Sequence, residues 1–502
     1  MRYIDLAEMC IADISSGKLV KNNRMPSLRN FRQQHSISMT TALNCYQHLE
    51  SLGWIIARPQ SGYFVCGQRM ANEKPELVTF KSMMTDPKLP DVQPYYQGKT
   101  YSASTVDSSH NTATKHSIYH PLNKETVGPL GVARISSDFI PLDKLQNSFR
   151  RALKRQGSNI SFYPDIQGEK ILRDTLSNHF KSYDFHIPSD ELLITNGCMD
   201  SIQTAIEICT DCGDAVAISS PCFNGLLDML AALGRKVVEI PSTEQGIDLA
   251  QLEQHMKSNQ IKAGLFCTSH MNPQGISMTA LQKQHLVNLA QTYKIPIIED
   301  DVYIELAHGK ITPLPAKHWD KHGYILWCGS VSKTIAAGYR LGWCWPGRYI
   351  AQYLQKRKYC NQGVSSPVQL GLADFISNGD YAKHLKKIRL AIQQHTLSYQ
   401  RYLTTNLPAT SKISDPSGGF VLWIQVPNLN GRKLLEQAHE CNIDIRIGEQ
   451  FSTRDLYQDY FRVNTGFMIT EGNDHHKDHQ EEVDKQLNKL MELVKVASSC
   501  TN

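Results

Sequence analysis

The chain has 502 residues, which is too many for one hydrophobic core and predicts two to four domains at roughly 100–200 residues each. Its composition, 41% hydrophobic and 20% charged, excludes a disordered or fibrous chain, and it offers neither a long apolar run nor the apolar core of a signal peptide. The net charge of +5 excludes no partner by itself, and the 13 scattered cysteines predict reduced thiols in a cytoplasmic protein without a membrane span.

Residues 1–68 are predicted to form three short helices followed by a β-hairpin. Apolar residues recur at helical spacing from Tyr3 to Ile14, Ser27 can cap a second helix over 28–35, and Ser38 can cap a third. Two apolar runs, 54–58 and 63–66, then flank a glycine-containing turn. This order is typical of the winged helix-turn-helix that binds DNA.

The charges of this first segment favour a polyanionic partner. Seven basic residues stand against four acidic ones in 1–68, and every charge between Ile14 and Leu49 is positive. A solvated surface with no partner is the alternative reading. Because the apolar stripe of the third helix is expected in the core, its polar face, with Thr40, Thr41 and Asn44, is the candidate for reaching phosphates and base edges.

The segments Met25–Arg29, Ser38–Ala42, Leu49–Trp54 and Arg58–Val65 together resemble the GntR-type winged helix-turn-helix. In that family a basic residue often stands where this chain has Met39. The resemblance implies double-stranded DNA as a partner and DNA-binding residues at the starts of the second and third helices and at the wing tip: Arg29, Ser38, Thr40, Thr41, Asn44, Ser61 and Gly62.

After the winged helix, residues 69–124 are predicted to be a linker, because 98–116 hold one Val and one Tyr among mainly Ser, Thr, His and Asn and cannot bury enough apolar surface to fold. The remainder, 125–502, is predicted to be an α/β domain with a mostly parallel central sheet. Its apolar runs read as strands buried on both faces, and a smaller C-terminal α+β lobe follows. The runs are 214–218, 236–240, 264–267, 295–299 and 324–328.

The motif from Ser330 to Trp343 holds the candidate for covalent chemistry. Lys333 directly follows a predicted strand among small hydroxyl residues, a place suited to a lysine that forms a Schiff base with a carbonyl group. Arg340, Ser330 and Ser332 could hold a phosphate. For a lone Ser-x-Lys a surface lysine would be the ordinary reading, but the spacing of the whole motif favours a site.

Three further motifs would meet this lysine at one edge of the sheet. Asp300 follows an apolar strand, and a carboxylate there could keep a pyridine nitrogen protonated. Asn272, in a turn, could donate to a phenolate oxygen. The segment 195–200 precedes a helix whose free N–H groups suit a phosphate.

Together, these motifs resemble fold-type I pyridoxal-phosphate enzymes of the aspartate aminotransferase class, over about 163–463. The resemblance implies pyridoxal phosphate bound covalently to Lys333, with Asp300 and Tyr303 as the other catalytic residues. By the same resemblance, Tyr163 would contact the phosphate of the cofactor bound to a neighbouring subunit, which implies a homodimer. Arg462 would bind the α-carboxylate of a substrate. The remaining cofactor-binding residues are Asn272, Gly197, Cys198, Met199, Phe223, Ser330, Ser332 and Arg340.

A winged helix joined by a linker to an aminotransferase-like domain resembles the MocR subfamily of GntR-type regulators. The leading hypothesis is a cytoplasmic transcription regulator that binds operator DNA and senses pyridoxal phosphate, an amino compound, or both. Two alternatives stay open: a working aminotransferase whose N-terminal unit only localises it, and a DNA-binding protein with a cofactor-free scaffold. Turnover of an amino acid and a keto acid would separate the first two.

No metal site is predicted. The pair Cys209 and Cys212 has the spacing of half a zinc site, but no second pair follows at a suitable distance. We therefore expect a helix end with two buried thiols.

Overall fold

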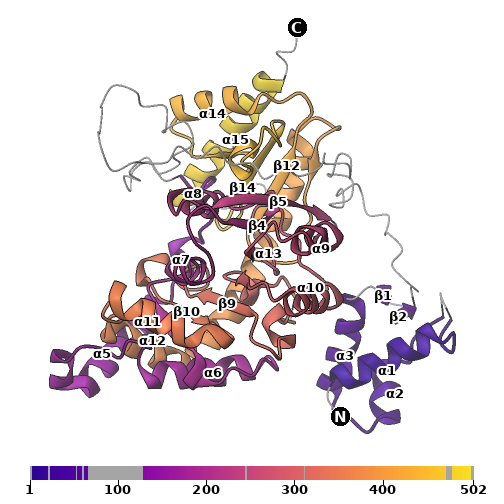
Figure 1. Ribbon diagram of the computed structural model, residues 1–502. Helices are drawn as coiled ribbons and strands as arrows, with labels where there is room; N and C mark the ends of the chain where they lie inside the picture. The colour runs from indigo at the N-terminus through magenta and orange to yellow at the C-terminus, as the bar shows by residue number, and fades with distance from the viewer. Residues whose placement is uncertain are drawn as a thin grey trace, which may run out of the picture. The chain divides into compact units, whose positions relative to one another are not determined.

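The computed structural model describes residues 3–20, 23–51, 54–58, 62–65, 128–243, 246–309, 311–470 and 478–498. The chain divides into two compact units, Met1–Glu76 and Leu77–Asn502, which are described separately (Figure 1). The predicted linker, 69–124, lies outside the described residues.

The first unit has the predicted helices and hairpin. It consists of α1 (Tyr3–Ser15), α2 (Leu28–Gln34), α3 (Met39–Ser51), β1 (Ile55–Arg58) and β2 (Gly62–Val65), and the two strands pair antiparallel. Both predicted caps form, because the Ser27 hydroxyl accepts from the Asn30 N–H at 3.2 Å and the Ser38 hydroxyl from the Thr41 N–H at 3.0 Å. The expected winged helix-turn-helix is therefore present.

The apolar stripe of α3 forms the centre of this unit, as predicted. Leu49 is fully buried and packs with Leu6 of α1 and Phe31 of α2. The Tyr46 hydroxyl donates to the Pro26 carbonyl at 2.8 Å, which ties α3 to the turn before α2. Because this face is used for packing, only the opposite face of α3 can meet a partner.

The second unit is built on an eight-stranded sheet of order β3-β10-β9-β8-β7-β4-β5-β6. The five strands β9, β8, β7, β4 and β5 run parallel, whereas β10 is antiparallel to both neighbours and β6 to β5. The sheet is thus mostly parallel, as expected. The strands are β3 (Leu193–Thr195), β4 (Ala215–Ser220), β5 (Lys236–Thr243), β6 (Gly246–Ile247), β7 (Ala263–Phe266), β8 (Ile297–Asp300), β9 (Ile325–Ser330) and β10 (Gly342–Trp345).

Helices cover both faces of this sheet. Val216 and Ile218 of β4 share a core with α7 (Cys198–Cys209), α8 (Asn224–Ala232) and α11 (Ile350–Cys360). Ala215 and Ala217 share a different core, with α9 (Leu249–Lys257) and α10 (Ala280–Tyr293). Because side chains alternate along a strand, burial on both faces explains the continuous apolar runs of the sequence.

The predicted α+β lobe is a four-stranded antiparallel sheet of order β11-β12-β14-β13. The long helix α13 joins the two parts of this unit, because Ile388 lies in the core of the large sheet and Leu403 in that of the lobe. The remaining elements are α5 (Leu142–Gln156), α6 (Lys170–Lys181), α12 (Ser366–Ser377), α13 (Asp380–Asn406), β11 (Lys412–Ile413), β12 (Val421–Gln425), α14 (Gly431–Glu440), β13 (Arg446–Ile447), β14 (Tyr460–Asn464) and α15 (Asp478–Ser498).

The last features of the fold concern the two cysteines at the end of α7 and the length of the helices. The prediction of two buried thiols is wrong, because Cys209 at the end of α7 is half-buried and Cys212, in the turn beyond it, is exposed. None of the described helices combines the length and the apolar character needed to cross a bilayer.

Candidate functional site

Asp300 is the last residue of β8, and the alternation of the strand decides which way its carboxylate faces. Glu299 accepts hydrogen bonds from the N–H groups of Ala316 and Lys317, and Asp301 accepts from the Trp327 indole. Asp300 instead accepts from the Cys198 thiol at the start of α7, at 3.4 Å. Burial raises the pKa of Asp300, although the Cys198 thiol and the Val302 N–H oppose the shift. Of three adjacent acids, Asp300 alone faces α7.

Lys333 lies two turn residues beyond β9, with its amine directed to the chain segment before α5. Its Nζ donates to the Ala133 carbonyl at 2.7 Å and lies 5.8 Å from the centre of the Tyr303 ring. Burial lowers the pKa of Lys333 to about 8, with the Arg462 guanidinium acting in the same direction and Asp300 opposing it. At that pKa about a tenth of the amine is neutral at pH 7, far more than for an ordinary lysine.

The start of α7, the end of β9 and the start of β10 meet where a phosphate was predicted. Gly197 precedes α7 with a φ of 94°, and a Cβ there would lie 2.8 Å from Arg340 Nη2. Arg340 itself donates to the Asn196 carbonyl at 3.1 Å. A Cβ on Gly342 would meet the Gly197 backbone at 2.6 Å. The glycines therefore permit a close approach that brings the first N–H groups of α7 beside a guanidinium.

The two predicted serines belong to the same corner. Ser330 pairs with Gly342 across β9 and β10, and its hydroxyl accepts from the Ser332 N–H at 3.1 Å. Ser330 is buried and Ser332 half-buried. Cys198 is buried and Met199 half-buried at the beginning of α7, so their side chains face the core while their backbone N–H groups belong to the open first turn.

Arg462 and Asn272 meet, although 190 residues separate them in the sequence. Arg462 Nη1 donates to Asn272 Oδ1 at 2.9 Å, and Nη2 donates to the Gly131 carbonyl. Arg462 is 2% exposed, and its burial lowers the pKa of the guanidinium to about 10. The cation is thus held by neutral acceptors, which leaves its charge available to an anion.

The site contains buried polar atoms with nothing to bind, which is what a cofactor site requires. In the described part of the chain, the Tyr303 hydroxyl and Arg462 Nε have no hydrogen-bond partner, although buried polar groups nearly always have one. The Asp300 carboxylate forms no ion pair shorter than 4 Å there either. A ring hydroxyl, a pyridine nitrogen and a carboxylate would complete these groups, so the residues present fit pyridoxal phosphate and an amino acid.

Two predicted residues stand apart from these contacts. Tyr163 is 83% exposed, as a residue that reaches another subunit would be. Phe223 is half-buried directly before α8, and a Cβ on Gly225 would lie 2.7 Å from its ring. The absence of a side chain at Gly225 therefore lets the Phe223 ring approach the helix backbone closely.

The predicted DNA-binding residues lie at the helix starts and the wing of the first unit. Arg29 and Gly62 are exposed, and Thr41 and Asn44 are half-buried. The exposed Ser38 hydroxyl, which caps α3, also lies 2.8 Å from the Thr41 hydroxyl. Ser61 and the side chain of Thr40 lie outside the described residues.

The sequence reasoning missed the segment 128–135. It lines the site through the carbonyls of Gly131 and Ala133, and its Leu130 packs in the core of the small lobe. Asn464 holds it in place by donating to the carbonyls of Pro129 and Arg134, at 2.7 and 2.9 Å. Backbone carbonyls leave no signal in the sequence, so only the conspicuous Asn464 beside Arg462 could have indicated the contact.

Comparison with known proteins supports both units. Residues 136–475 match the family of class I and II aminotransferases. Over 493 residues, or 98% of this chain and 99% of the relative, the sequence is 31% identical to the uncharacterized HTH-type transcriptional regulator YdcR of Escherichia coli (strain K12). The chain belongs to the MocR subfamily of GntR-type regulators.

Other relatives of this MocR-type regulator agree. The HTH-type transcriptional regulator YjiR of Escherichia coli (strain K12), also uncharacterized, is 30% identical over 94% of this chain and 96% of its own. The multiple substrate aminotransferase of Thermococcus profundus shares the fold, with a TM-score of 0.66 at 19% identity, over 74% of this chain and 93% of its own. The α-aminoadipate aminotransferase LysN of Thermus thermophilus, complexed with N-(5'-phosphopyridoxyl)-L-leucine, also has a TM-score of 0.66, at 18% identity, over 74% of this chain and 92% of its own. Pyridoxal phosphate is the cofactor of this fold.

Proposed function

We propose that this cytoplasmic regulator binds a double-stranded DNA operator through its winged helix and senses pyridoxal phosphate, an amino compound, or both through its large unit. One observation carries the proposal. A winged helix occurs in one chain with a half-buried Lys333, a buried Asp300 and the unpartnered buried atoms Tyr303 Oη and Arg462 Nε, which together fit the cofactor. The DNA contacts would come from the starts of α2 and α3 and from the wing.

Each proposed site residue of the large unit would have a role that agrees with its position. Pyridoxal phosphate, when bound, supplies an aldehyde that reacts with amines and a ring that withdraws electrons. Lys333 would hold the aldehyde end, since its low pKa makes the neutral, nucleophilic amine accessible. Asp300 would hold the protonated pyridine nitrogen, and Tyr303 and Asn272 the ring hydroxyl. The phosphate would bind Gly197, Cys198 and Met199 through their N–H groups, with Ser330, Ser332 and Arg340, while Phe223 would stack on the ring.

Arg462 indicates which chemical class of effector the site would bind. A guanidinium binds a carboxylate through two parallel hydrogen bonds, and this one has a buried nitrogen without a partner. We therefore expect an effector that carries both an amine and a carboxylate. Its binding can shift the regulator only by the difference between its affinities for the two states.

Homodimerisation belongs to the same proposal. The segment after α5 exposes three large apolar side chains within four residues, with Ile160 54%, Phe162 73% and Tyr163 83% exposed. A second copy would cover them and place Tyr163 on the phosphate of the partner. Sedimentation velocity of wild type beside Phe162→Ser would test this, with a monomer expected for the variant.

The decisive experiment is an absorbance spectrum of the purified protein with added pyridoxal phosphate, wild type beside Lys333→Ala. We expect a visible band in the wild type that the variant lacks. Titration with amino acids would follow, with binding to a duplex selected from a random pool by the full-length protein as the readout. No visible band in either protein would contradict the role of Lys333.

A working aminotransferase is the second candidate, favoured by the contact between Arg462 and Asn272. Substrate binding and cofactor orientation would then be coupled through one hydrogen bond. An enzyme should exchange amino groups between an amino acid and a keto acid at about 1–10³ s⁻¹. A single half-reaction without turnover would favour the regulator.

A further inference from the structure

Two helices of the large unit carry an excess of exposed cations that the cofactor site does not use. Helix α5 has five basic residues and one acid, Asp143, and α13 has three exposed lysines in its first two turns. We call these eight side chains the basic surface: Lys144, Arg150, Arg151, Lys154, Arg155, Lys383, Lys386 and Lys387.

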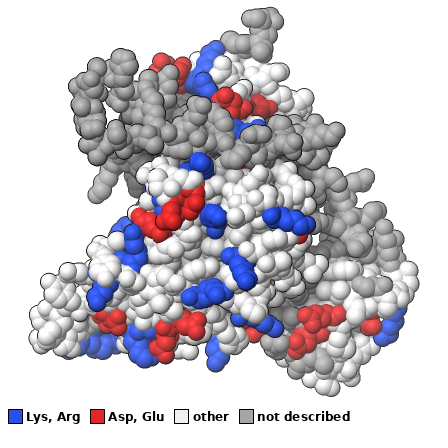
Figure 2. Space-filling model, in the orientation of Figure 1, with Lys and Arg blue, Asp and Glu red and all other residues white. Residues whose placement is uncertain are grey.

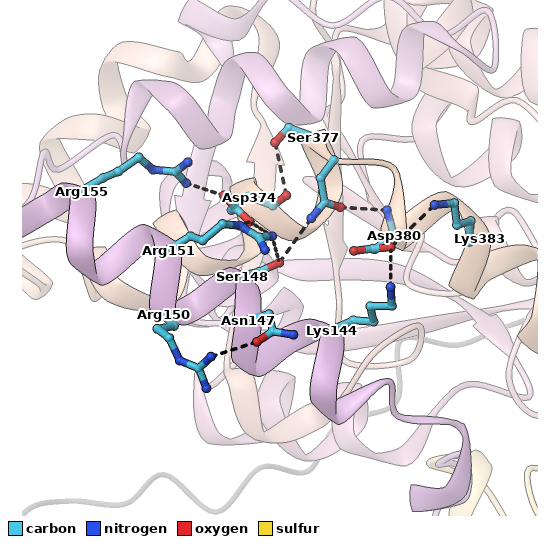
Figure 3. A network of polar contacts seen from close by, with 11 residues as sticks. Lys144, Asn147, Ser148, Arg150, Arg151, Arg155, Asp374, Ser377, Asp380 and Lys383 are labelled. Carbon is cyan, nitrogen blue, oxygen red and sulfur yellow. Dashed lines mark hydrogen bonds and ion pairs between the residues drawn. The ribbon is translucent and has the colours of Figure 1, made fainter.

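The two helices form one surface because their beginnings meet at Asp380. The Asp380 carboxylate lies 3.8 Å from Lys144 Nζ on α5 and 3.8 Å from Lys383 Nζ on α13 (Figure 3). The two lysines therefore lie side by side around a single acid. The cations of α5 continue from this point toward its C-terminal end, and those of α13 along its next turn.

Acidic partners neutralise only part of the basic surface. Asp374 of α12 pairs with Arg151, at 2.5 Å, and with Arg155 (Figure 3). These guanidiniums hold the pKa of Asp374 below its usual range, yet their side chains stay 49% and 61% exposed. Among the described residues, Arg150 donates only to Asn147, at 3.1 Å. Lys154, Lys386 and Lys387 form no ion pair with any described residue.

Such an excess differs from an ordinary solvated surface. On the face drawn in Figure 2, basic and acidic side chains are interspersed, which is the arrangement expected when charges serve solubility. Like charges held together repel one another and favour binding of a polyanion. Arg150 and Lys154, and likewise Lys383 and Lys387, are four residues apart, about 6 Å along a helix. The charges of one DNA strand recur about every 3.4 Å along the duplex axis, so cations at this spacing can meet a row of phosphates.

We propose that the basic surface binds the phosphate backbone of DNA flanking the operator. The inference rests on the proposed operator binding, because the winged helix of the same chain would bring this DNA to a high effective concentration. The contacts would add affinity without reading sequence, since phosphates position a protein and base edges specify the site. The large unit would then be a second DNA-binding surface of the regulator.

The test compares full-length wild type with the variant Arg150→Gln/Lys154→Gln/Lys386→Gln/Lys387→Gln. A matched control removes four exposed lysines of other elements: Lys236→Gln/Lys257→Gln/Lys262→Gln/Lys321→Gln. The probes are a duplex selected from a random pool by the wild type, trimmed to its core site, and the same core with 20 base pairs of random sequence added on each side.

We expect the flanks to strengthen wild-type binding about 10-fold at low salt and to increase the dependence of affinity on salt. The variant should lose that gain, with a salt slope smaller by about 0.9 for each phosphate contact removed. The control should behave like wild type, and all three proteins should bind the core duplex equally.

Flanks that strengthen the variant and the wild type equally would overturn the proposal and direct attention to an acidic protein partner for the basic surface. Failure of wild type to bind any duplex would instead contradict the proposed function itself. The thermal unfolding temperature and the visible band of the bound cofactor establish folding. Lys386→Gln/Lys387→Gln replaces the fourfold variant if that one does not fold.

Discussion

The two units of this regulator place their proposed functional residues in opposite ways. In the winged helix, Arg29 and Gly62 are exposed and come from one stretch of 1–68. In the large unit, Lys333 contacts Ala133 and Arg462 contacts Gly131, across 200 and 331 residues. A surface that meets a polymer needs only local structure, whereas a site that surrounds a small molecule needs distant segments. A substitution that impairs DNA binding by the first unit should therefore leave cofactor binding by the second intact, and the reverse.

Removal of the Lys333 amine should have the largest effect. We expect Lys333→Ala to lose the visible band completely, because Lys333 supplies the amine proposed to hold the aldehyde covalently. DNA binding without effector should persist if the units are independent. Lys294→Ala, which removes an exposed lysine, is the control, and a visible band in Lys333→Ala would refute the assignment.

The second largest effect is expected from a cavity in the core of either unit, which should impair the function of that unit alone. Leu49 is fully buried in the winged helix and Leu403 in the lobe of the large unit. Each change to alanine should lower the free energy of unfolding of its own unit by about 2–5 kcal/mol. Leu49→Ala should therefore weaken DNA binding and leave the visible band intact, and Leu403→Ala should weaken cofactor retention. Loss of both functions in either variant would show that the units fold as one.

The Arg462→Lys variant should retain the cofactor and bind the effector more weakly. An ammonium cannot form the two parallel bonds of a guanidinium, and a hydrogen bond to a charged group contributes about 1.5–3 kcal/mol. We expect a 10- to 100-fold weaker response to amino acids, measured as a shift of the visible band during titration. Arg432→Lys, on the exposed face of α14, should respond like wild type.

The pH dependence of cofactor binding tests the environment of Lys333. Only the neutral amine reacts, and a pKa of about 8 means that its fraction rises nearly 10-fold from pH 6 to pH 7 and levels off above pH 8. The rate at which the visible band forms should follow this curve. A rate that keeps rising towards pH 10 would indicate an ordinary lysine.

The smallest effect is expected at the exposed cation of α2. Arg29→Gln should weaken binding to the selected duplex a few-fold and lower the salt slope by about 0.9, the value for one phosphate contact. Lys18→Gln is the control, because Lys18 is 73% exposed and already pairs with Asp13. Equal effects of both changes would indicate a general charge effect and no specific contact.

The elements that could be predicted are those that one local signal decides. Ser27 and Ser38 cap their helices as expected, and the apolar runs became β4, β5, β7, β8 and β9. The strands β3 and β10 are among those that were not predicted, as are β6, β11, β13 and β14. Leu193–Thr195 is only three residues long, and Gly342–Trp345 lies inside a motif that was read for its chemistry.

The sequence by itself determined the two-part architecture, the family and the residue types of the site, because motif spacing and side-chain periodicity are local properties. Only the tertiary structure decided that Asp300, and neither Glu299 nor Asp301, faces α7, and that the carbonyls of Gly131 and Ala133 hold Arg462 and Lys333. It also joined the cations of α5 and α13 at Asp380. These arrangements depend on packing between segments hundreds of residues apart, which no local pattern records.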